Sequence, residues 1–517
     1  MKKIFFLLTL LLAAGGRAAA LTVAVYHTSD AHGWYSARPA RWDNAQPARL
    51  IGGFAALAAQ LEKETSPYLL LDSGDMFQGT PEGILTKGLA SVTLMNQLGY
   101  AAAAPGNHDY DYGEGPLKAM IAAAKFPFLA ANVYEKKTGA PAPYFKPYTV
   151  LTVAGKRIAV LGLAGSHTGT STRPDGVRHL EFRDEAAEAA ARLPEIKKLA
   201  PDAVILLIHR GITEDLSVKS VDVSTWTFED LGAHSALLVA RAAPGIDLLL
   251  GGHHHAALLN GYRDPVSGTV LGESGYGLSN VTRAELTFDE ATGKLTGVSA
   301  GIVPLWVDQT GQDPAVLATI AGFSAQVEKE MGQTVGQAKT DLLFSPERLD
   351  SGIGNWVSDV TREVTGAQLA FQNTGAIRAE IRKGPVRLRD LYQAMPFDNN
   401  IITMRLTGAQ VRRLLADNLV GPKSFMQVSG LTVEFKPGPG REPALLRVKY
   451  RGREIKDAQE FTIATNDYLA GGGDGGAVFS GGKEIEDTML PVRDALIKAF
   501  AKGPVSAPPA GRIKRLP

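Results

Sequence analysis

The sequence contains no cysteine at all. This absence excludes disulfide bonds, a thiolate nucleophile and zinc held by cysteine. Neither sign of charge dominates, because 54 Lys and Arg face 53 Asp and Glu and the formal net charge is +1. Binding of nucleic-acid polymers depends on clustered basic surface, so a polymer partner is not expected.

Long apolar runs are also scarce, and the first residues hold the most prominent one. Lys2-Lys3 precedes an apolar stretch over 4–14, and Ala18-Ala19-Ala20 offers a small-residue cleavage site. This arrangement is typical of a signal peptide, and the stretch is too short to span a bilayer comfortably. We therefore expect a periplasmic or secreted protein without a stable membrane anchor.

The length of 517 residues exceeds that of an ordinary single domain. Hydrophobic residues make up 45% and charged residues 21%, as in a globular protein with a large core. Strand and helix patterns alternate, which predicts a layered α/β architecture. We expect a signal peptide at 1–20, a catalytic domain at 21–307, a connector helix and hinge at 308–336 and a smaller C-terminal domain at 337–517.

Three local predictions within these ranges can be checked directly. One helix is expected over 83–98, and a loose tail over 504–517. Strands at 269–271, 281–288 and 295–304 are expected to pair antiparallel and to close the first domain.

Five apolar runs in the first domain each end in metal-type ligands. The runs lead into Asp30-Ala31-His32, Gly74-Asp75, Gly106-Asn107-His108-Asp109, His209 and Gly252-His253-His254-His255. In open α/β sheets, ligands bind beyond the carboxyl ends of the strands. We therefore predict one metal site built from all five ends.

The predicted ligands are Asp30, His32, Asp75, Asn107, His209, His253 and His255. Their number suits two divalent ions, with the Asp75 carboxylate able to bridge both. Imidazole favours zinc, manganese, cobalt or a similar ion over calcium or magnesium. In an extended segment residues i and i+2 point the same way, so Asp30 with His32, and His253 with His255, are each expected to grip one ion.

His108 directly follows the predicted ligand Asn107, and its side chain should face away from the metals. Asp111, three residues later, could orient the imidazole ring. A ring held in this way can stabilise phosphoryl oxygens or protonate a leaving group. The other histidines, His27, His167, His179, His234 and His254, are interpreted as ordinary core or surface residues.

The five blocks, in this order, resemble the calcineurin-like metallophosphoesterases. The run Gly-Asn-His-Asp-Tyr-Asp at 106–111 is similar to that of the secreted 5′-nucleotidases. The resemblance implies a four-layer β-sandwich flanked by helices, a metal-dependent phosphoric ester hydrolase, and a catalytic pair formed by His108 and Asp111. Asp109 and Tyr110 stand where Glu and Phe are commoner.

Three blocks in the second domain suit nucleotide recognition. Asn373-Thr374-Gly375-Ala376-Ile377-Arg378 joins a carboxamide to a guanidinium, which can bind phosphate. The stretches at 395–399 and 465–475 each present an aromatic side chain in a loop. Two aromatic rings can clamp a planar base, and a nearby acid can accept hydrogen bonds from ribose.

The same blocks resemble the C-terminal domain of the 5′-nucleotidases. The resemblance implies that Phe397 and Tyr468 stack on the base and that Asp474 binds the ribose. It also assigns substrate contacts to Asn373, Gly375 and Arg378, and, with a poorer match in spacing, to Arg348.

The predicted function is hydrolysis of nucleoside 5′-monophosphates, extending to UDP-sugars or other nucleotide diphosphates. A 2′,3′-cyclic-nucleotide phosphodiesterase with 3′-nucleotidase activity and a thiosulfohydrolase of sulfur oxidation share the same first domain. A non-catalytic nucleotide-binding protein is the alternative from another class. Asp111 and the two aromatic loops favour the 5′-nucleotidase. The sequence leaves the oligomeric state, the native metal and the preferred base open.

Overall fold

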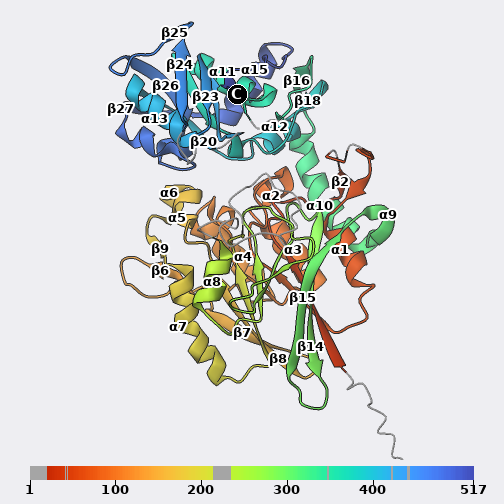
Figure 1. The fold of residues 1–517 in the computed structure, drawn as a ribbon. Coiled ribbons are helices and arrows are strands. Elements are labelled where there is room, and N and C mark those ends of the chain that lie inside the picture. The colour runs from red at the N-terminus through yellow and green to blue at the C-terminus, as the bar shows by residue number, and fades with distance from the viewer. Residues whose placement is uncertain are drawn as a thin grey trace, which may run out of the picture.

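The computed structural model describes residues 20–40, 42–43, 45–212, 235–345, 349–420, 423–438 and 443–517. Residues 1–19 of the expected signal peptide, His234 and Arg348 lie outside this part. Two bodies of mixed α/β structure are stacked in Figure 1, and helix α10 (Pro314–Met331) runs between them.

The N-terminal body is built on two sheets. The first has the order β15 (Leu295–Pro304), β14 (Asn280–Asp289), β1 (Ala20–Thr28), β4 (Tyr68–Asp72) and β5 (Ala102–Ala103). The second has the order β12 (Tyr262–Arg263), β13 (Val270–Glu273), β11 (Leu248–Gly251), β10 (Ala203–Ile208), β8 (Lys156–Leu163) and β7 (Tyr148–Val153).

Helices cover the outer face of each sheet. The first sheet packs against α1 (Phe54–Leu61), α3 (Leu89–Leu98), α4 (Glu114–Ala123) and α10, and the second against α7 (Glu185–Lys198) and α8 (Ala236–Ala242). The shorter elements of this body are α2 (Pro81–Thr86), α5 (Thr168–Ser171), α6 (Pro174–Val177), α9 (Val307–Thr310), β2 (Arg38–Pro39), β3 (Leu50–Ile51), β6 (Val133–Glu135) and β9 (Leu180–Phe182). The result is the predicted four-layer sandwich.

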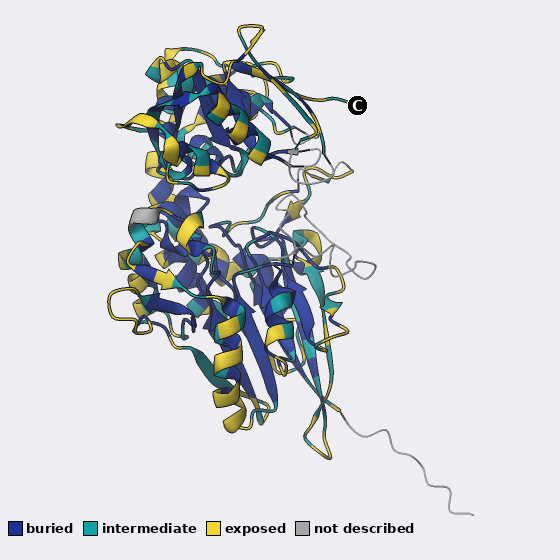
Figure 2. Cartoon of the chain, turned by 60° about the vertical axis from the view of Figure 1, so that its left-hand side comes forward, coloured by how far each residue is buried: buried dark blue, intermediate teal, exposed yellow. Residues whose placement is uncertain are grey.

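Residue alternation explains why both faces of each sheet are buried. In β10, Ile205 and Leu207 point into the core between the sheets, whereas Val204 and Leu206 point toward the helices. Figure 2 shows both sheets as buried interior. A strand covered on both faces needs a nearly continuous apolar sequence, as β10 has.

Parallel pairing brings the polar ends of the strands together. Strands β1, β4 and β5 are parallel in the first sheet, and β8, β10, β11 and β13 are parallel in the second. Because the carboxyl ends of parallel strands meet at one edge, the segments that follow them converge there.

Two local predictions for this body are wrong. The helix expected over 83–98 is divided into α2 and α3, because Lys87 and Gly88 take left-handed φ values of 48° and 85°. Strand β13 pairs parallel with β11, and antiparallel only with the short β12; only β14 and β15 form the expected antiparallel pair. Strand direction depends on tertiary neighbours, which an alternating pattern does not reveal.

The C-terminal body has two main sheets, and helices pack on both faces of the larger, five-stranded one. The central sheet has the order β22 (Met426–Ser429), β17 (Leu369–Asn373), β26 (Glu460–Asn466), β19 (Asn400–Thr407) and β27 (Lys483–Pro491). Its faces pack against α11 (Gly352–Thr365), α12 (Leu388–Ala394) and α15 (Val492–Lys502) on one side, and α13 (Gly408–Asn418) on the other. The second sheet has the order β25 (Arg453–Glu454), β24 (Leu445–Tyr450), β23 (Leu431–Lys436) and β28 (Ile513–Arg515). Smaller elements are β16 (Thr334–Ala338), β18 (Gly384–Arg387), β20 (Leu419–Val420), β21 (Lys423–Ser424) and α14 (Asp467–Ala470).

The expected loose tail is part of this second sheet. Strand β28 pairs parallel with β23, and Arg512 forms an ion pair of 2.7 Å with Asp359. The Asp350 carboxylate accepts backbone N–H bonds from Gly511 and Arg512. The proline-rich composition of the segment did not indicate that it contains an edge strand.

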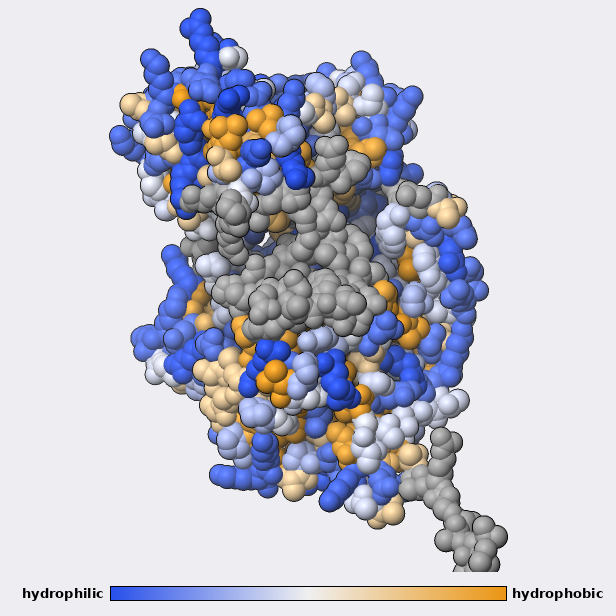
Figure 3. All heavy atoms as spheres, in the orientation of Figure 1, coloured by the Kyte–Doolittle hydropathy of each residue, from blue (hydrophilic) through white to orange (hydrophobic). Residues whose placement is uncertain are grey.

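Helix α10 lies in the range predicted for the connector. Asp313 caps it by accepting a hydrogen bond of 2.7 Å from the Val316 amide. The helix packs against α1, α2 and α3 of the first body and against α12 of the second. None of the helices in the described part of the chain has the length and apolar character needed to cross a bilayer. On the face in Figure 3, hydrophilic residues dominate the outer surface of both bodies.

Candidate active site at the junction of the two domains

Six of the seven predicted metal ligands form two buried clusters. Asp30, His32 and His255 make one, and Asp75, His209 and His253 make the other, with the possible ligand atoms of each cluster within 4.8 Å of one another. The seventh, Asn107, places its Oδ1 3.2 Å from His209 Nε2 and 3.0 Å from His253 Nδ1. The structure thus brings all seven residues together.

Asp75 lies between the two clusters. Its Oδ2 is 3.6 Å from His32 Nε2 in the first cluster and 3.2 Å from His209 Nε2 in the second. Its Oδ1 accepts a hydrogen bond of 2.8 Å from the His108 amide, which fixes the plane of the carboxylate. This position is the one that a bridging ligand would need.

Hydrogen bonds leave the facing atoms free to bind cations. His32 Nδ1 and His209 Nδ1 each lie 2.6 Å from a carbonyl oxygen, of Gln78 and Ser73 respectively. A carbonyl only accepts, so each Nδ1 carries a proton and each Nε2 faces its cluster, where it can bind a cation in place of a proton. The Asn107 amide donates to the Ser171 carbonyl at 2.7 Å, which likewise turns its Oδ1 inward. The donor set therefore fits two divalent cations.

The backbone at this site is strained. Asp30, His32, Asp75, His253 and His255 have φ values of 51°, 48°, 57°, 74° and 58°. Non-glycine residues rarely occupy this left-handed region, and such residues cluster at functional sites. The pairing of Asp30 with His32 was predicted, but the backbone is left-handed rather than extended. His253 and His255 do not share a cluster as predicted, because the turns at these residues send their side chains to different clusters.

Two glycines allow the loop after β4 and the loop after β5 to approach one another. A Cβ on Gly74 would lie 2.2 Å from the Gly106 nitrogen, and one on Gly106 would lie 2.2 Å from Asp75 Oδ1. Asp109 then joins the loops, since its carboxylate accepts backbone hydrogen bonds from Asp75, Met76 and Gly106 at 2.8–3.0 Å. The sequence analysis did not assign this role to Asp109.

The buried carboxylates of the two clusters require positive charge nearby. Burial raises the pKa of Asp30 to about 7. Burial opposes a charged His209, but the adjacent Asp75 carboxylate outweighs it and raises the pKa of His209 to about 10. The proton that His209 holds beside Asp75 occupies the place where a cation would compensate the carboxylates.

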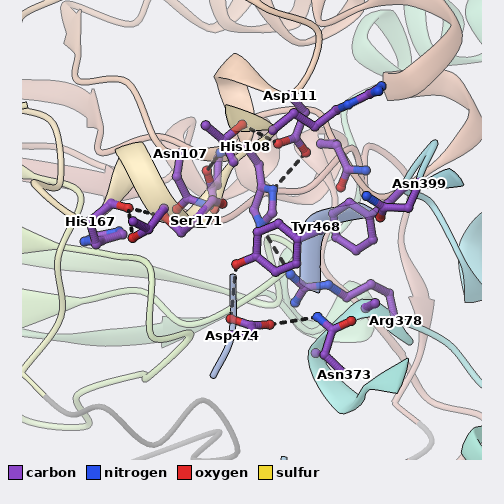
Figure 4. Close-up of a pocket in the computed structure, with 18 of the residues that line it drawn as sticks. Asn107, His108, Asp111, His167, Ser171, Asn373, Arg378, Asn399, Tyr468 and Asp474 are labelled. Carbon is purple, nitrogen blue, oxygen red and sulfur yellow. Dashed lines mark hydrogen bonds and ion pairs between the residues drawn. The ribbon is translucent and has the colours of Figure 1, made fainter. Parts of the chain in front are cut away.

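His108 and Asp111 form the predicted pair. His108 Nδ1 lies 2.8 Å from Asp111 Oδ2, and Nε2 lies 3.3 Å from Arg378 Nη2 of the second domain (Figure 4). Burial opposes a charged ring, but the carboxylates of Asp111 and Asp75 raise the pKa of His108 above its ordinary value. Arg378 only donates, so Nε2 accepts in this contact, and the raised pKa favours a proton on Nε2 once an anion takes up the guanidinium.

The second domain closes the other side of a cavity of about 460 Å³. The predicted substrate residues that line it are Asn373, Gly375, Arg378, Phe397, Tyr468 and Asp474. Asp474 accepts hydrogen bonds from the Tyr468 hydroxyl at 3.2 Å and the Asn373 amide at 2.8 Å (Figure 4). A Cβ on Gly473 would lie 2.3 Å from the Tyr468 ring, so glycine is what lets the ring lie against this backbone.

His167 also lines the cavity, although the sequence analysis took it for an ordinary residue. Its ring centroid is 3.8 Å from that of His253. Like other residues of the site, His167 lies a few residues after the end of a strand, here β8. That position was the feature of the sequence that could have indicated its place in the cavity. His254 belongs to neither cluster, and burial lowers its pKa to about 3.

Comparison with known proteins identifies the two halves of the chain. Residues 23–257 match the calcineurin-like phosphoesterase family, and residues 334–481 match the 5′-nucleotidase, C-terminal domain. The chain is 27% identical to the trifunctional nucleotide phosphoesterase protein YfkN of Bacillus subtilis, over 96% of this chain and 35% of that protein. It is 26% identical to Protein UshA of Escherichia coli, over 88% of this chain and 86% of that protein.

Solved structures agree with this assignment. The 5′-nucleotidase precursor of Thermus thermophilus superposes with a TM-score of 0.81 at 26% identity, covering 96% of this chain and 99% of that one. The sulfate thiohydrolase SoxB of Thermus thermophilus has a TM-score of 0.75 at 19% identity, covering 96% of each chain, and shares the fold.

Fold, clusters and matches together define a metal-dependent phosphoric ester hydrolase. Within that class, the chain joins a calcineurin-like phosphoesterase domain to a 5′-nucleotidase C-terminal domain. The chain spans about a third of the length of YfkN and most of the length of UshA.

Proposed function

We propose that this protein hydrolyses nucleoside 5′-monophosphates to nucleoside and phosphate. The observation that carries the proposal is one cavity of about 460 Å³, which both domains line. Its N-terminal wall holds candidate metal ligands and the His108–Asp111 pair, and its C-terminal wall holds two aromatic side chains and Arg378. A substrate with a phosphate at one end and a planar base at the other suits such a cavity.

The two clusters are proposed to hold one divalent ion each, with Asp75 shared. When bound, such ions neutralise charge on a phosphoryl group and help to activate water. The chain supplies the buried carboxylates and the inward-facing nitrogens described above. Water then attacks phosphorus, the bond from phosphorus to the 5′-oxygen breaks, and the 5′-oxygen leaves as the nucleoside hydroxyl.

His108 is proposed to act at the phosphoryl group through Nε2. Asp111 holds the Nδ1 proton, which leaves the Nε2 proton directed into the cavity. From there it can donate a hydrogen bond to a phosphoryl oxygen or pass the proton to the leaving 5′-oxygen. Arg378, 3.3 Å from Nε2, is placed to share the same anion.

The nucleoside is proposed to bind against the second domain. Phe397 and Tyr468 would stack on the base, and Asp474 would accept hydrogen bonds from the ribose hydroxyls. Asn373 holds Asp474, and Gly375 leaves room beside it, since a Cβ there would lie 3.3 Å from Asp474 Oδ2.

The test is phosphate release by the purified protein with manganese or zinc added. The panel is AMP, a 3′-nucleotide, a 2′,3′-cyclic nucleotide and a UDP-sugar. We expect AMP to be preferred, with the UDP-sugar as a slower substrate. A preference for the 3′- or cyclic nucleotides would move the function to a phosphodiesterase, and silence on all four would contradict the proposal.

Export is a further part of the proposal. It rests on the basic, apolar and small-residue regions of 1–20. N-terminal sequencing of the protein made in its own cells would test it, with a new N-terminus near Leu21 as the expected result.

A further inference from the structure

A short segment of the first domain lies across the loop that carries the catalytic pair. This segment, residues 167–172, contains α5 and lines the cavity at His167, Thr170, Ser171 and Thr172. The sequence analysis gave none of these residues a role. Figure 4 shows His167 and Ser171 beside Asn107, with His108 and Asp111 beyond them.

Thr172 contacts the carboxylate that orients His108. Its Oγ1 lies 2.8 Å from Asp111 Oδ1, while His108 Nδ1 lies 2.8 Å from Asp111 Oδ2. A carboxylate only accepts, so the threonine hydroxyl must donate. Each oxygen of Asp111 thus has one side-chain donor, and the two together fix the carboxylate plane.

This contact is buried. Thr172 is 2% exposed and Asp111 is 8% exposed. A hydrogen bond to a charged group away from water is stronger than one between neutral groups. Loss of the hydroxyl would therefore free the carboxylate to rotate away from the imidazole.

The residue before Thr172 orients a second group in the same way. The Ser171 carbonyl accepts the hydrogen bond of 2.7 Å from the Asn107 amide, so Asn107 turns its oxygen inward. Ser171 and Thr172 thus orient the side chains at the two ends of the loop 107–111.

The segment is anchored from the far side by helix α7. Glu185, 1% exposed, accepts a hydrogen bond of 2.6 Å from the Ser166 amide and pairs with Arg210 at 3.1 Å. Arg210 also donates to Ser166 Oγ at 3.1 Å. The chain that leads into the segment is therefore held by the fold.

We propose that Thr172 is a positioning residue that completes a Thr172–Asp111–His108 chain. It acts through Asp111. Enzymes fix a catalytic imidazole in this way: a second group orients the ring, and a third group holds the second. The inference rests on the proposed hydrolytic function.

The first test compares three variants with AMP and with p-nitrophenyl phosphate. Thr172→Val keeps the shape and removes the hydroxyl, and kcat should fall about tenfold or more with KM within about twofold. Thr172→Ser keeps the hydroxyl and should restore kcat to within about threefold. Thr168→Val is the control, because the Thr168 hydroxyl is buried in the same segment without a hydrogen-bond partner among the described residues. It should leave kcat unchanged.

A double-variant cycle separates positioning from general packing. In an Asp111→Ala background, Thr172→Val should lower kcat by less than about twofold, because the contact is already lost. An undiminished further loss would show that Thr172 acts independently of Asp111 and would overturn the proposal. Equal losses in Thr172→Val and Thr172→Ser would overturn it as well.

A measurement without turnover keeps this inference distinct from the proposed function. The His108 Nδ1 proton should give a low-field proton resonance, assigned by its absence in His108→Asn. The resonance should persist in Thr172→Ser and be weakened by faster exchange in Thr172→Val. An unchanged resonance in Thr172→Val contradicts the positioning role, whereas an intact pattern in a protein inactive on every nucleotide contradicts only the proposed function.

Discussion

The two walls of the cavity are built in different ways. Behind the N-terminal wall, Asp30 and His209 are fully buried, and five of the seven predicted ligands have left-handed backbones at strand ends. On the C-terminal wall, Phe397, Arg378 and Tyr468 are only partly buried and lie in loops or a single helical turn. A buried wall with a constrained backbone suits the chemical step. A more exposed wall suits selection of the substrate. Changes to the first should decide whether reaction occurs, and changes to the second should decide on which substrate.

The largest effect is expected from Asp75→Asn. This variant removes charge from a side chain that lies within 3.6 Å of both clusters, so both ions should bind more weakly and kcat should fall at least about a thousandfold. Metal analysis after dialysis and phosphate release would measure the two effects. Asp72→Asn is the matched control, because burial raises the pKa of Asp72 to about 8 and makes it neutral at pH 7. If Asp75→Asn retained two tightly bound ions, Asp75 would not be shared between them.

The next largest effect is expected from His108→Ala. The ring belongs to neither cluster, so metal content should stay at the wild-type level. The value of kcat should fall about 10²–10⁴-fold, as expected for loss of a general acid or of an electrostatic stabiliser. Loss of metal from this variant would show that His108 is itself a ligand.

Changes on the C-terminal wall should alter selectivity. Removal of a stacking partner in Phe397→Ala or Tyr468→Ala should weaken AMP binding about 5- to 100-fold. Turnover of p-nitrophenyl phosphate, which lacks a base, should change little. Tyr468→Phe keeps the ring and loses only the hydrogen bond to Asp474, so its KM for AMP should rise less. Equal losses on both substrates would mean that these rings support the fold and do not bind the base.

The smallest effect is expected far from the cavity, at Asp264. Burial opposes its charge, but hydrogen bonds from Arg241 and Ser267 outweigh burial and lower its pKa to about 2. Because the folded-state value lies below the ordinary 3.8, this carboxylate stabilises the fold above about pH 4 and loses that effect as pH falls toward 2. Asp264→Asn should lower Tm by about 2–4 °C at pH 7 and by less near pH 3, with metal content unchanged. A constant difference in Tm across that range would show that the charge is not responsible.

The sequence predicted the alternation of strands and helices and the convergence of the polar strand ends, because both follow from local patterns. Asp30 and His32 were paired correctly, yet the left-handed backbone that pairs them was not foreseen. The division of His253 and His255 between clusters depends on turn geometry, which spacing alone does not determine. Strand β28 was missed because its pairing with β23 comes from tertiary contacts.

Residues that act through another residue were the hardest to find. His167 and Thr172 lie outside the motifs, Asp109 lies within one, and the roles of all three follow only from what they touch. Thr172 is 61 residues from Asp111 in the chain. A pattern read along the sequence finds groups at strand ends but not their partners across the fold.

The most direct test of the account is a crystal structure of His108→Asn with manganese and AMP. The account predicts two ions, one in each cluster, with Asp75 contacting both. It further predicts the AMP phosphate against the clusters and the adenine between Phe397 and Tyr468. A single ion, or an adenine bound away from both rings, would contradict the division of the cavity into a catalytic wall and a recognition wall.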